Sequence, residues 1–291
     1  MFDLKKHIKA DSVDEAIELL MENPDAKLIA GGTDVLIKLR DGKPGFSELV
    51  DIHDLKELKV IRQDKNNNIL IGSGATFIDI IQSDIVTNHL PMLCEAAQSV
   101  GGPQIRNVAT IGGNVCNGVT SADSAPSLFA LNAVLEIQGQ GTKRQLPIAD
   151  FYLGPGKVDL KKGEVLTTFK ITVENYQKYF GHFYKYAMRN AMDIATIVCA
   201  VSLKTKKHIL TDFRIAFGVA GPVPIRCPET EKRVINKKVS KNLLNEIFQT
   251  IETDVNPRTS WRAAKDFRMN IIKELSKRAT KEALIRAGEE V

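Results

Sequence analysis

Two glycine-rich segments are the parts of the sequence best suited to binding chemistry. IAGGTDV spans residues 29–35 and ATIGGNV spans residues 109–115. Consecutive small residues let backbone N–H groups turn toward one concave site that accepts an anion such as a phosphate. In the first segment, Thr33 and Asp34 add a hydroxyl and a carboxylate for sugar hydroxyls, and the second segment repeats this design. Together the two segments could hold a pyrophosphate from two sides, although either alone could be a tight turn.

Two charged residues outside these segments are further candidates. Asp123, in TSADSAPS, follows the second segment closely enough for a loop to fold back across it. Its carboxylate could accept hydrogen bonds from sugar hydroxyls, and helix N-capping is an equal alternative. Lys185, in FYKYAMR, could balance negative charge on a bound redox ring such as a flavin, or be a surface-strand lysine.

Other catalytic and metal signatures are absent from the sequence. IGSGATF, residues 71–77, begins like a dinucleotide-binding fingerprint, but Phe77 replaces its third glycine. We therefore expect a strand-to-helix turn in which Thr76 caps the helix. Neither G-x-x-x-x-G-K-[ST] nor G-x-S-x-G occurs, and the four cysteines and five histidines are dispersed. We expect no metal ligands and no catalytic side chains on this chain.

The elements that must position these residues indicate an α+β chain. Residues 11–23 have the periodicity of a helix capped by Ser12, and residues 90–100 that of a second helix. Strand-like stretches through the middle of the chain imply a largely antiparallel sheet, and the sequence from about residue 229 is mostly helical. A composition shift near residue 176 predicts a domain boundary. We expect Trp261 to anchor the C-terminal helix on the sheet.

The composition is that of an ordinary globular protein. Of 291 residues, 43% are apolar and 26% are charged. The longest apolar stretch, residues 194–201, is far shorter than the roughly 20 residues that span a membrane, and charges near the start do not fit a signal peptide. We therefore expect a cytoplasmic protein. Residues 229–291 hold 14 basic and 10 acidic residues, mixed along helices, which predicts a solvated face and no nucleic-acid binding.

Several of these motifs together resemble one family. KLIAGGTDVL, GPQIRNVATIGGNVCNG, SADSAP, FYKYAMRNAMDIAT and TSWRAAKDFR occur in the order typical of the FAD-binding subunits of molybdenum hydroxylases, which include those of bacterial xanthine dehydrogenase and the medium subunits of carbon monoxide dehydrogenase. The resemblance implies a vanillyl-alcohol-oxidase type FAD-binding fold over residues 1–176, with α+β subdomains at about 1–56 and 57–176. A C-terminal domain, residues 177–291, would hold an antiparallel sheet with helices.

The resemblance also implies roles for individual residues. The two glycine segments would hold the pyrophosphate and ribityl chain, Asp123 the nucleotide end, and Val165 or Leu166 would pack near the flavin, with Lys185 beside the isoalloxazine. The implied cofactor-binding residues are Leu28, Ile29, Ala30, Gly31, Gly32, Thr33, Asp34, Val35, Thr110, Ile111, Gly112, Gly113, Asn114, Asp123, Val165, Leu166 and Lys185. Neither glycine segment contains a histidine, so we expect FAD to bind without a covalent bond.

For the activity, the resemblance implies electron transfer within a complex. A large partner subunit would carry the molybdenum cofactor and a small one two [2Fe–2S] clusters, and FAD on this chain would pass electrons to NAD or another acceptor. Met192, followed by Asp193, stands where eukaryotic relatives have an acidic residue near the flavin, which leaves the acceptor open. The alternatives are the flavin subunit of a related hydroxylase that oxidises an aldehyde, nicotinate or CO, and a free-standing FAD reductase.

Overall fold

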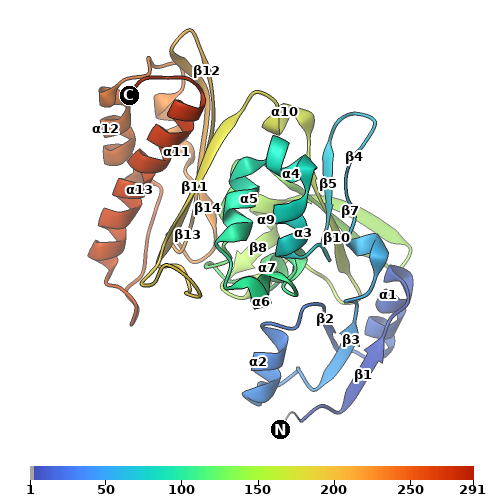
Figure 1. The fold of residues 1–291 in the computed structure, drawn as a ribbon. Helices are drawn as coiled ribbons and strands as arrows, with labels where there is room; N and C mark the ends of the chain where they lie inside the picture. Colours follow the sequence, from blue (N-terminus) through green and yellow to red (C-terminus); the bar gives the residue numbers. More distant parts are fainter. Residues whose placement is uncertain (1–2) are drawn as a thin grey trace.

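The computed structural model describes residues 3–291 and contains a small N-terminal lobe, a larger central body and a C-terminal sheet covered by helices (Figure 1). The predicted α+β class is therefore confirmed. Among these residues, no helix is long and apolar enough to cross a membrane.

The small lobe is built on a three-stranded parallel sheet in the order β1-β3-β2. Ser12 caps its first helix as predicted, because its hydroxyl accepts a hydrogen bond from the Glu15 N–H at 3.0 Å. The lobe consists of β1 (Lys6–Lys9), α1 (Val13–Glu22), β2 (Lys27–Ile29), α2 (Val35–Arg40), β3 (Glu48–Asp51) and the 3-10 turn η1 (Lys56–Leu58).

The central body has a five-stranded antiparallel sheet in the order β4-β5-β10-β6-β7, with short helices against it. Thr76 caps α3 in a capping box with Asp79, as the sequence predicted. The elements are β4 (Ile61–Gln63), β5 (Ile69–Gly72), α3 (Phe77–Gln82), α4 (Asp84–His89), α5 (Pro91–Gln98), α6 (Pro103–Arg106), α7 (Ile111–Cys116), α8 (Ala125–Ala130), β6 (Val134–Gly139), β7 (Thr142–Pro147), α9 (Ile148–Phe151), β8 (Tyr152–Gly154), β9 (Lys157–Val158), β10 (Val165–Ile171) and α10 (Val173–Tyr176).

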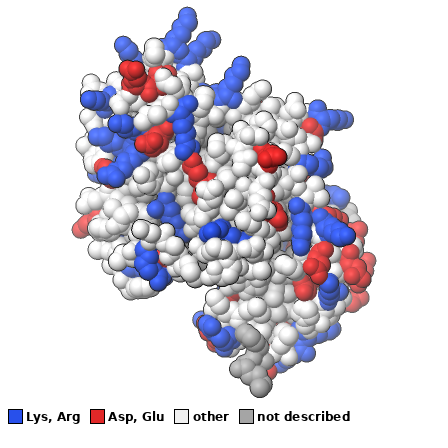
Figure 2. All heavy atoms as spheres, in the orientation of Figure 1, with Lys and Arg blue, Asp and Glu red and all other residues white. Residues whose placement is uncertain are grey.

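The C-terminal part has a four-stranded antiparallel sheet in the order β11-β12-β13-β14, and α13 packs on β11 and β12. Figure 2 shows acidic side chains interspersed among the basic ones over this part of the surface, in agreement with the mixed helical charge of the sequence. The elements are β11 (Phe180–Tyr186), β12 (Ile197–Lys206), β13 (Ile209–Gly218), β14 (Ile225–Arg226), α11 (Pro228–Val234), α12 (Lys241–Thr250), the 3-10 turn η2 (Ile251–Thr253) and α13 (Lys265–Arg286).

The structure corrects two expectations about these elements. The strand-like stretches do not form one sheet, because α10 and a left-handed Lys178 (φ 63°) separate β10 from β11, so the predicted boundary at residue 176 falls between two sheets. Trp261 does not anchor the C-terminal helix, since it is 85% exposed. The aliphatic residues Ile272, Leu275 and Leu284 are the ones that α13 buries.

Candidate functional site

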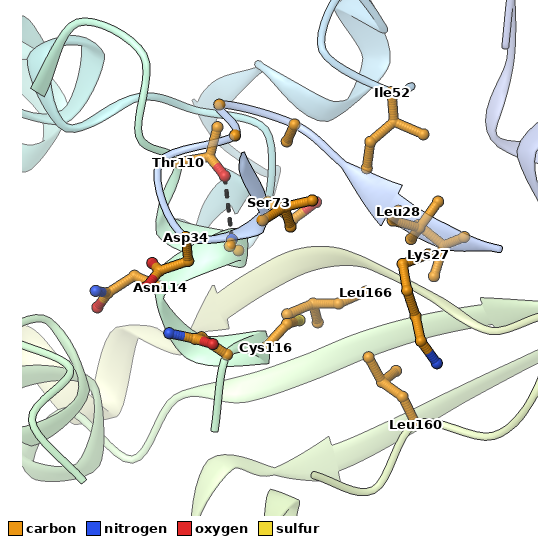
Figure 3. A pocket seen from close by; sticks show the side chains of 18 of the residues that line it. Lys27, Leu28, Asp34, Ile52, Ser73, Thr110, Asn114, Cys116, Leu160 and Leu166 are labelled. Carbon is orange, nitrogen blue, oxygen red and sulfur yellow. Dashed lines mark hydrogen bonds between the residues drawn. The ribbon is translucent and has the colours of Figure 1, made fainter. Parts of the chain in front are cut away.

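A cavity of about 720 Å³ lies between the small lobe and the central body. This volume is in the range of pockets that bind small molecules and cofactors. Apolar side chains, among them Leu28, Ile52 and Leu160, line one end of it, whereas Asp34 and Asn114 lie at the other end (Figure 3). Of the predicted binding residues, the following line the cavity: Leu28, Ala30, Gly31, Gly32, Thr33, Asp34, Val35, Thr110, Gly112, Gly113, Asn114, Val165 and Leu166.

The first glycine segment connects β2 to α2 and presents unused backbone donors to this cavity. The N–H groups of residues 31–34 donate no hydrogen bond to any described part of the chain. Gly32 has a φ of 70°, a left-handed conformation that glycine adopts at little cost and that turns the chain sharply here. Four consecutive amides next to a cavity are suited to an anionic ligand, because N–H groups that a bound ligand removes from solvent require acceptors.

The second glycine segment is built differently from the expectation. Residues 111–116 form α7, and Thr110 caps it by accepting a hydrogen bond from the Gly113 N–H at 3.0 Å (Figure 3). The Ile111 and Gly112 amides donate to the carbonyls of Ala75 and Ser73. The expectation that backbone amides of this segment bind the pyrophosphate is therefore wrong, because the amides at the start of α7 already have acceptors within the protein. The segment can offer a ligand its side chains instead.

Two glycines in these segments are required by close packing of the chain on itself. A Cβ placed on Gly31 would lie 1.8 Å from the Val108 carbonyl oxygen, and one on Gly112 would lie 2.6 Å from the Ser73 carbonyl oxygen. By contrast, a Cβ on Gly113 would meet only the Thr110 hydroxyl, at 3.0 Å. Gly31 and Gly112 thus allow the walls of the cavity to pack closely, whereas Gly113, like Gly32, has no backbone atom near its Cβ position.

Asp123 and Lys185 form an ion pair behind the polar end of the cavity. The Lys185 ammonium donates to the Asp123 carboxylate at 2.7 Å and to the Ser99 carbonyl at 3.0 Å. Both side chains are largely buried, so the surface-lysine alternative is wrong, and Ser124, not Asp123, occupies the N-cap position of α8. Asn114 connects this pair to the cavity, because its side-chain oxygen accepts the Ser124 hydroxyl at 2.7 Å.

This contact changes the expected roles of the two residues. FAD is an extended molecule, so side chains in direct contact cannot hold its nucleotide end and its isoalloxazine end respectively. Burial raises the pKa of Asp123 to about 6, although the neighbouring Lys185 ammonium acts in the opposite direction. The other Asp123 carboxylate oxygen is buried and has no hydrogen-bond partner among the described residues. The Asp123–Lys185 pair therefore has one carboxylate oxygen that can still accept a hydrogen bond.

The structure adds cavity residues that the sequence did not single out. The Lys38 ammonium donates to the Asn117 side-chain oxygen at 2.6 Å, and both residues line the cavity, so this bond links the small lobe to the central body. Lys38 lies four residues after Asp34, a spacing that places neighbouring side chains on one face of a helix and could have identified it. Two predicted residues, Ile29 and Ile111, are instead buried in the apolar core.

No cluster of metal-ligating side chains occurs within residues 3–291. The four cysteines are unpaired and lie singly, and three of them are buried. Burial raises the pKa of the Cys116 thiol, which lines the cavity, to about 12. These thiols therefore have the character of neutral packing groups.

Comparisons with known proteins agree with this architecture. Residues 2–172 match the family described as the FAD binding domain in molybdopterin dehydrogenase, and residues 182–283 match the CO dehydrogenase flavoprotein C-terminal domain. The chain is 44% identical to the xanthine dehydrogenase FAD-binding subunit of Escherichia coli O157:H7, over 99% of each chain. It is 31% identical to the glyceraldehyde dehydrogenase medium chain of Sulfolobus acidocaldarius, over 95% of this chain and 97% of that one.

The fold has an equally clear counterpart among solved structures. A chain of carbon monoxide dehydrogenase from Hydrogenophaga pseudoflava superposes with a TM-score of 0.93 and 27% identity, over 98% of this chain and 99% of that chain. This likeness confirms the expected FAD-binding fold with its C-terminal domain. The chain belongs to the family of FAD-binding subunits of molybdenum hydroxylases.

Proposed function

We propose that this chain is the FAD-carrying electron-transfer subunit of a xanthine dehydrogenase. In this proposal a large partner subunit holds the molybdenum cofactor, a small one holds [2Fe–2S] clusters, and NAD or another acceptor takes the electrons. The full-length identity of 44% to a xanthine dehydrogenase FAD-binding subunit supports this choice over a related hydroxylase. Because catalysis of substrate oxidation belongs to the partners, the isolated chain should not oxidise substrate.

The observation that carries FAD binding is the row of unused amides at residues 31–34 beside the cavity. We infer that these N–H groups hold the pyrophosphate from one side. The Thr110 hydroxyl and the Asn114 amide would contact the ligand from the other side, in place of the backbone of α7. Neither glycine segment contains a histidine that could form a covalent bond to FAD. We therefore expect FAD to bind non-covalently.

The two ends of the cavity suggest how FAD is oriented. Asn114 lines the cavity and accepts a hydrogen bond from Ser124, the residue next to Asp123 of the Asp123–Lys185 pair. We therefore place the isoalloxazine ring at this polar end. The adenine then lies at the apolar end, beside Leu28 and Leu160. A ring between aliphatic side chains is stabilised by burial of its apolar faces.

Bound FAD would accept single electrons and release them in pairs. The chain itself positions the ring and adjusts its electronic properties. We expect the Lys185 ammonium, which Asp123 holds in place, to offset negative charge that develops on the reduced ring. The unsatisfied Asp123 oxygen is an acceptor for an N–H of the ring or for a ribityl hydroxyl.

The test is reduction of the flavin by xanthine. The chain, expressed with the products of neighbouring genes, should purify as a yellow complex whose flavin is bleached when xanthine is added without oxygen. The isolated chain should be yellow and should not respond. A colourless chain that FAD cannot reconstitute would contradict flavin binding, and bleaching by an aldehyde, nicotinate or CO alone would favour a related hydroxylase.

The second candidate is a free-standing FAD reductase with the same fold. It requires the isolated chain to turn over a substrate, since no partner would be needed. Multiple turnovers of the purified chain with NADH or NADPH and an oxidised substrate would therefore support the reductase and contradict the subunit.

A further inference from the structure

An exposed apolar surface lies at one end of the C-terminal sheet, outside the cavity. Trp261 is 85% exposed and Met188 is 67% exposed. We call this surface the Trp261 face; its apolar members are Met188, Met192, Ile194, Trp261 and Phe267. Exposed aromatic and methionine side chains that gather in one place are typical of protein–protein interfaces.

Hydrogen bonds and a ring contact join the two segments that form this face, the loop of residues 187–195 and the segment 257–267. Arg268 donates to the Thr196 carbonyl, just after the loop, and to the Ser260 hydroxyl at 2.8 Å, just before Trp261. The Phe267 ring lies 6.0 Å from that of Tyr186, at the start of the loop. Figure 1 shows the start of α13 and the β11–β12 connection at the same end of the sheet.

The tryptophan is held outward by a short turn. The Ser260 N–H donates to the Ala263 carbonyl at 3.0 Å, so Trp261 and Arg262 occupy the tip. The Arg262 guanidinium lies 4.2 Å from the centre of the Trp261 ring. This cation–π contact limits the motion of the indole while leaving its other face free to pack against another molecule.

The same face carries an excess of positive charge, because Arg258, Arg262 and Lys265 outnumber Asp266 in the segment 257–267. Arg268 is only 2% exposed, its Nε has no hydrogen-bond partner, and no described carboxylate pairs with its guanidinium. Burial and the nearby charges of Arg258 and Arg262 lower its pKa, but an arginine remains charged in proteins. Asp193, in the loop, already pairs with the Arg189 guanidinium and accepts hydrogen bonds from the Arg189 and Ile194 amides. A buried cation without an anion is costly, so an external carboxylate would stabilise this cluster.

We propose that the Trp261 face is the docking surface for a partner polypeptide that packs apolar side chains around Trp261 and places a carboxylate beside Arg258 and Arg262. The proposal rests on the proposed function, in which this chain is one subunit of a complex. Because the face is positively charged, we expect the partner's contacting surface to be acidic. Because the face also exposes apolar side chains, we expect the partner to pack apolar side chains against them.

A polypeptide fits this face better than a nucleotide or a nucleic acid. Phosphate contacts would use only the cations of this face, whereas a tryptophan, two methionines, an isoleucine and a phenylalanine are exposed beside them and would stay uncovered. Residues of these types, together with arginine, form the energetically dominant centre of protein interfaces.

The position of the face connects it to the cofactor site. The loop begins just after β11, which contains Lys185. Within the loop, the sulfur of Met192 accepts a hydrogen bond from the side-chain amide of Gln104 at 3.6 Å. Ile105, the next residue in α6, lines the cavity. A partner docked here therefore covers the side of the molecule at which the Asp123–Lys185 pair lies, which is where electrons would enter or leave the flavin ring.

The experiment uses the tagged chain co-expressed with its neighbouring gene products. Trp261→Ala is compared with Ile285→Ala, and Arg262→Glu and the exposed Arg258→Glu are compared with Lys281→Glu, an equal charge change further along α13. Partner retained on purification and the Kd of the reassembled complex are measured, together with FAD content and thermal unfolding of each variant. We expect Trp261→Ala to weaken association about tenfold or more, with unchanged FAD content and unchanged controls.

Several outcomes would overturn the proposal. Full retention of the partner by Trp261→Ala and Arg258→Glu would show that the face lies outside the interface. Loss of NADH oxidation with an intact complex would identify a nucleotide site instead. A dimer of the wild-type chain alone that Trp261→Ala dissociates would identify a second copy as the occupant. Failure of the proposed function looks different, since the wild-type chain would then lack FAD or purify without partners.

Discussion

Gly31 and the Val108 carbonyl oxygen are so close that a methyl group on Gly31 would lie 1.8 Å from that oxygen. The small lobe and the central body therefore touch, backbone to backbone, at the edge of the cavity. A side chain at this position can be accommodated only by moving one of the two segments.

Gly31→Ala should consequently destabilise the protein and open the cavity wall. We expect a loss of about 2–3 kcal/mol in the free energy of unfolding, as for other overpacked sites, together with weaker FAD binding. Urea unfolding and FAD titration measure both effects. Gly154→Ala is the control, because a Cβ there meets nothing within 4 Å. Equal stability of the two variants would refute the close contact.

Gly113→Val tests ligand approach without disturbing the backbone. Since a Cβ on Gly113 meets only the Thr110 hydroxyl, the variant should fold normally yet bind FAD at least about tenfold more weakly, because the added methyl groups enter the cavity. Gly112→Val, which pushes on Ser73, should instead lower the unfolding temperature. Undiminished FAD uptake by a folded Gly113→Val protein would remove α7 from the pyrophosphate site.

Asp123 should make stability depend on pH in a defined window. Its pKa is raised to about 6 from an unfolded value of 3.8, so the native state binds the proton more tightly. Its contribution to stability is therefore largest below about pH 4, falls as the pH rises to about 6 and is constant above that, a change of up to about 3 kcal/mol. Unfolding free energies of the apo wild type and Asp123→Asn should diverge across this window. Parallel curves would contradict the raised pKa.

The orientation of FAD separates the effects of two substitutions. Leu28→Ala should weaken FAD binding by about 1–2 kcal/mol through lost burial, with an unchanged flavin reduction potential, because Leu28 lies at the apolar end, where we place the adenine. Lys185→Met should make the potential more negative, since the cation that stabilises the reduced ring is gone. Dye-linked reductive titration measures the potential. A shift in Leu28→Ala and none in Lys185→Met would mean that FAD is bound the other way round.

The sequence predicted which segments line the cavity but not the conformation of the second one. The glycine pairs, their order and the capping of α1 and α3 follow from local residue types, and local rules suffice for them. The amides of α7 could not be assigned from sequence, because their acceptors, Ser73 and Ala75, come from a segment more than 30 residues away. The Asp123–Lys185 contact joins residues 62 positions apart for the same reason.

The exposure of Trp261 was missed because a lone aromatic residue in a helical region is usually buried. Its place at the tip of a four-residue turn depends on the Ser260–Ala263 hydrogen bond, which no sequence pattern indicated. The buried arginine behind it was also unpredictable, since arginine is rarely found inside a protein without an acidic partner.

The small lobe has only modest apolar clusters of its own, and one of them is completed by Val165 of β10, in the central body. It should therefore detach as a cooperative unit before the rest of the protein unfolds. When it does, one wall of the cavity leaves with it, so opening of the lobe gives a bound flavin a route of release. Amide exchange in β1–β3 should slow when FAD is bound, while exchange in β12 and β13 stays the same.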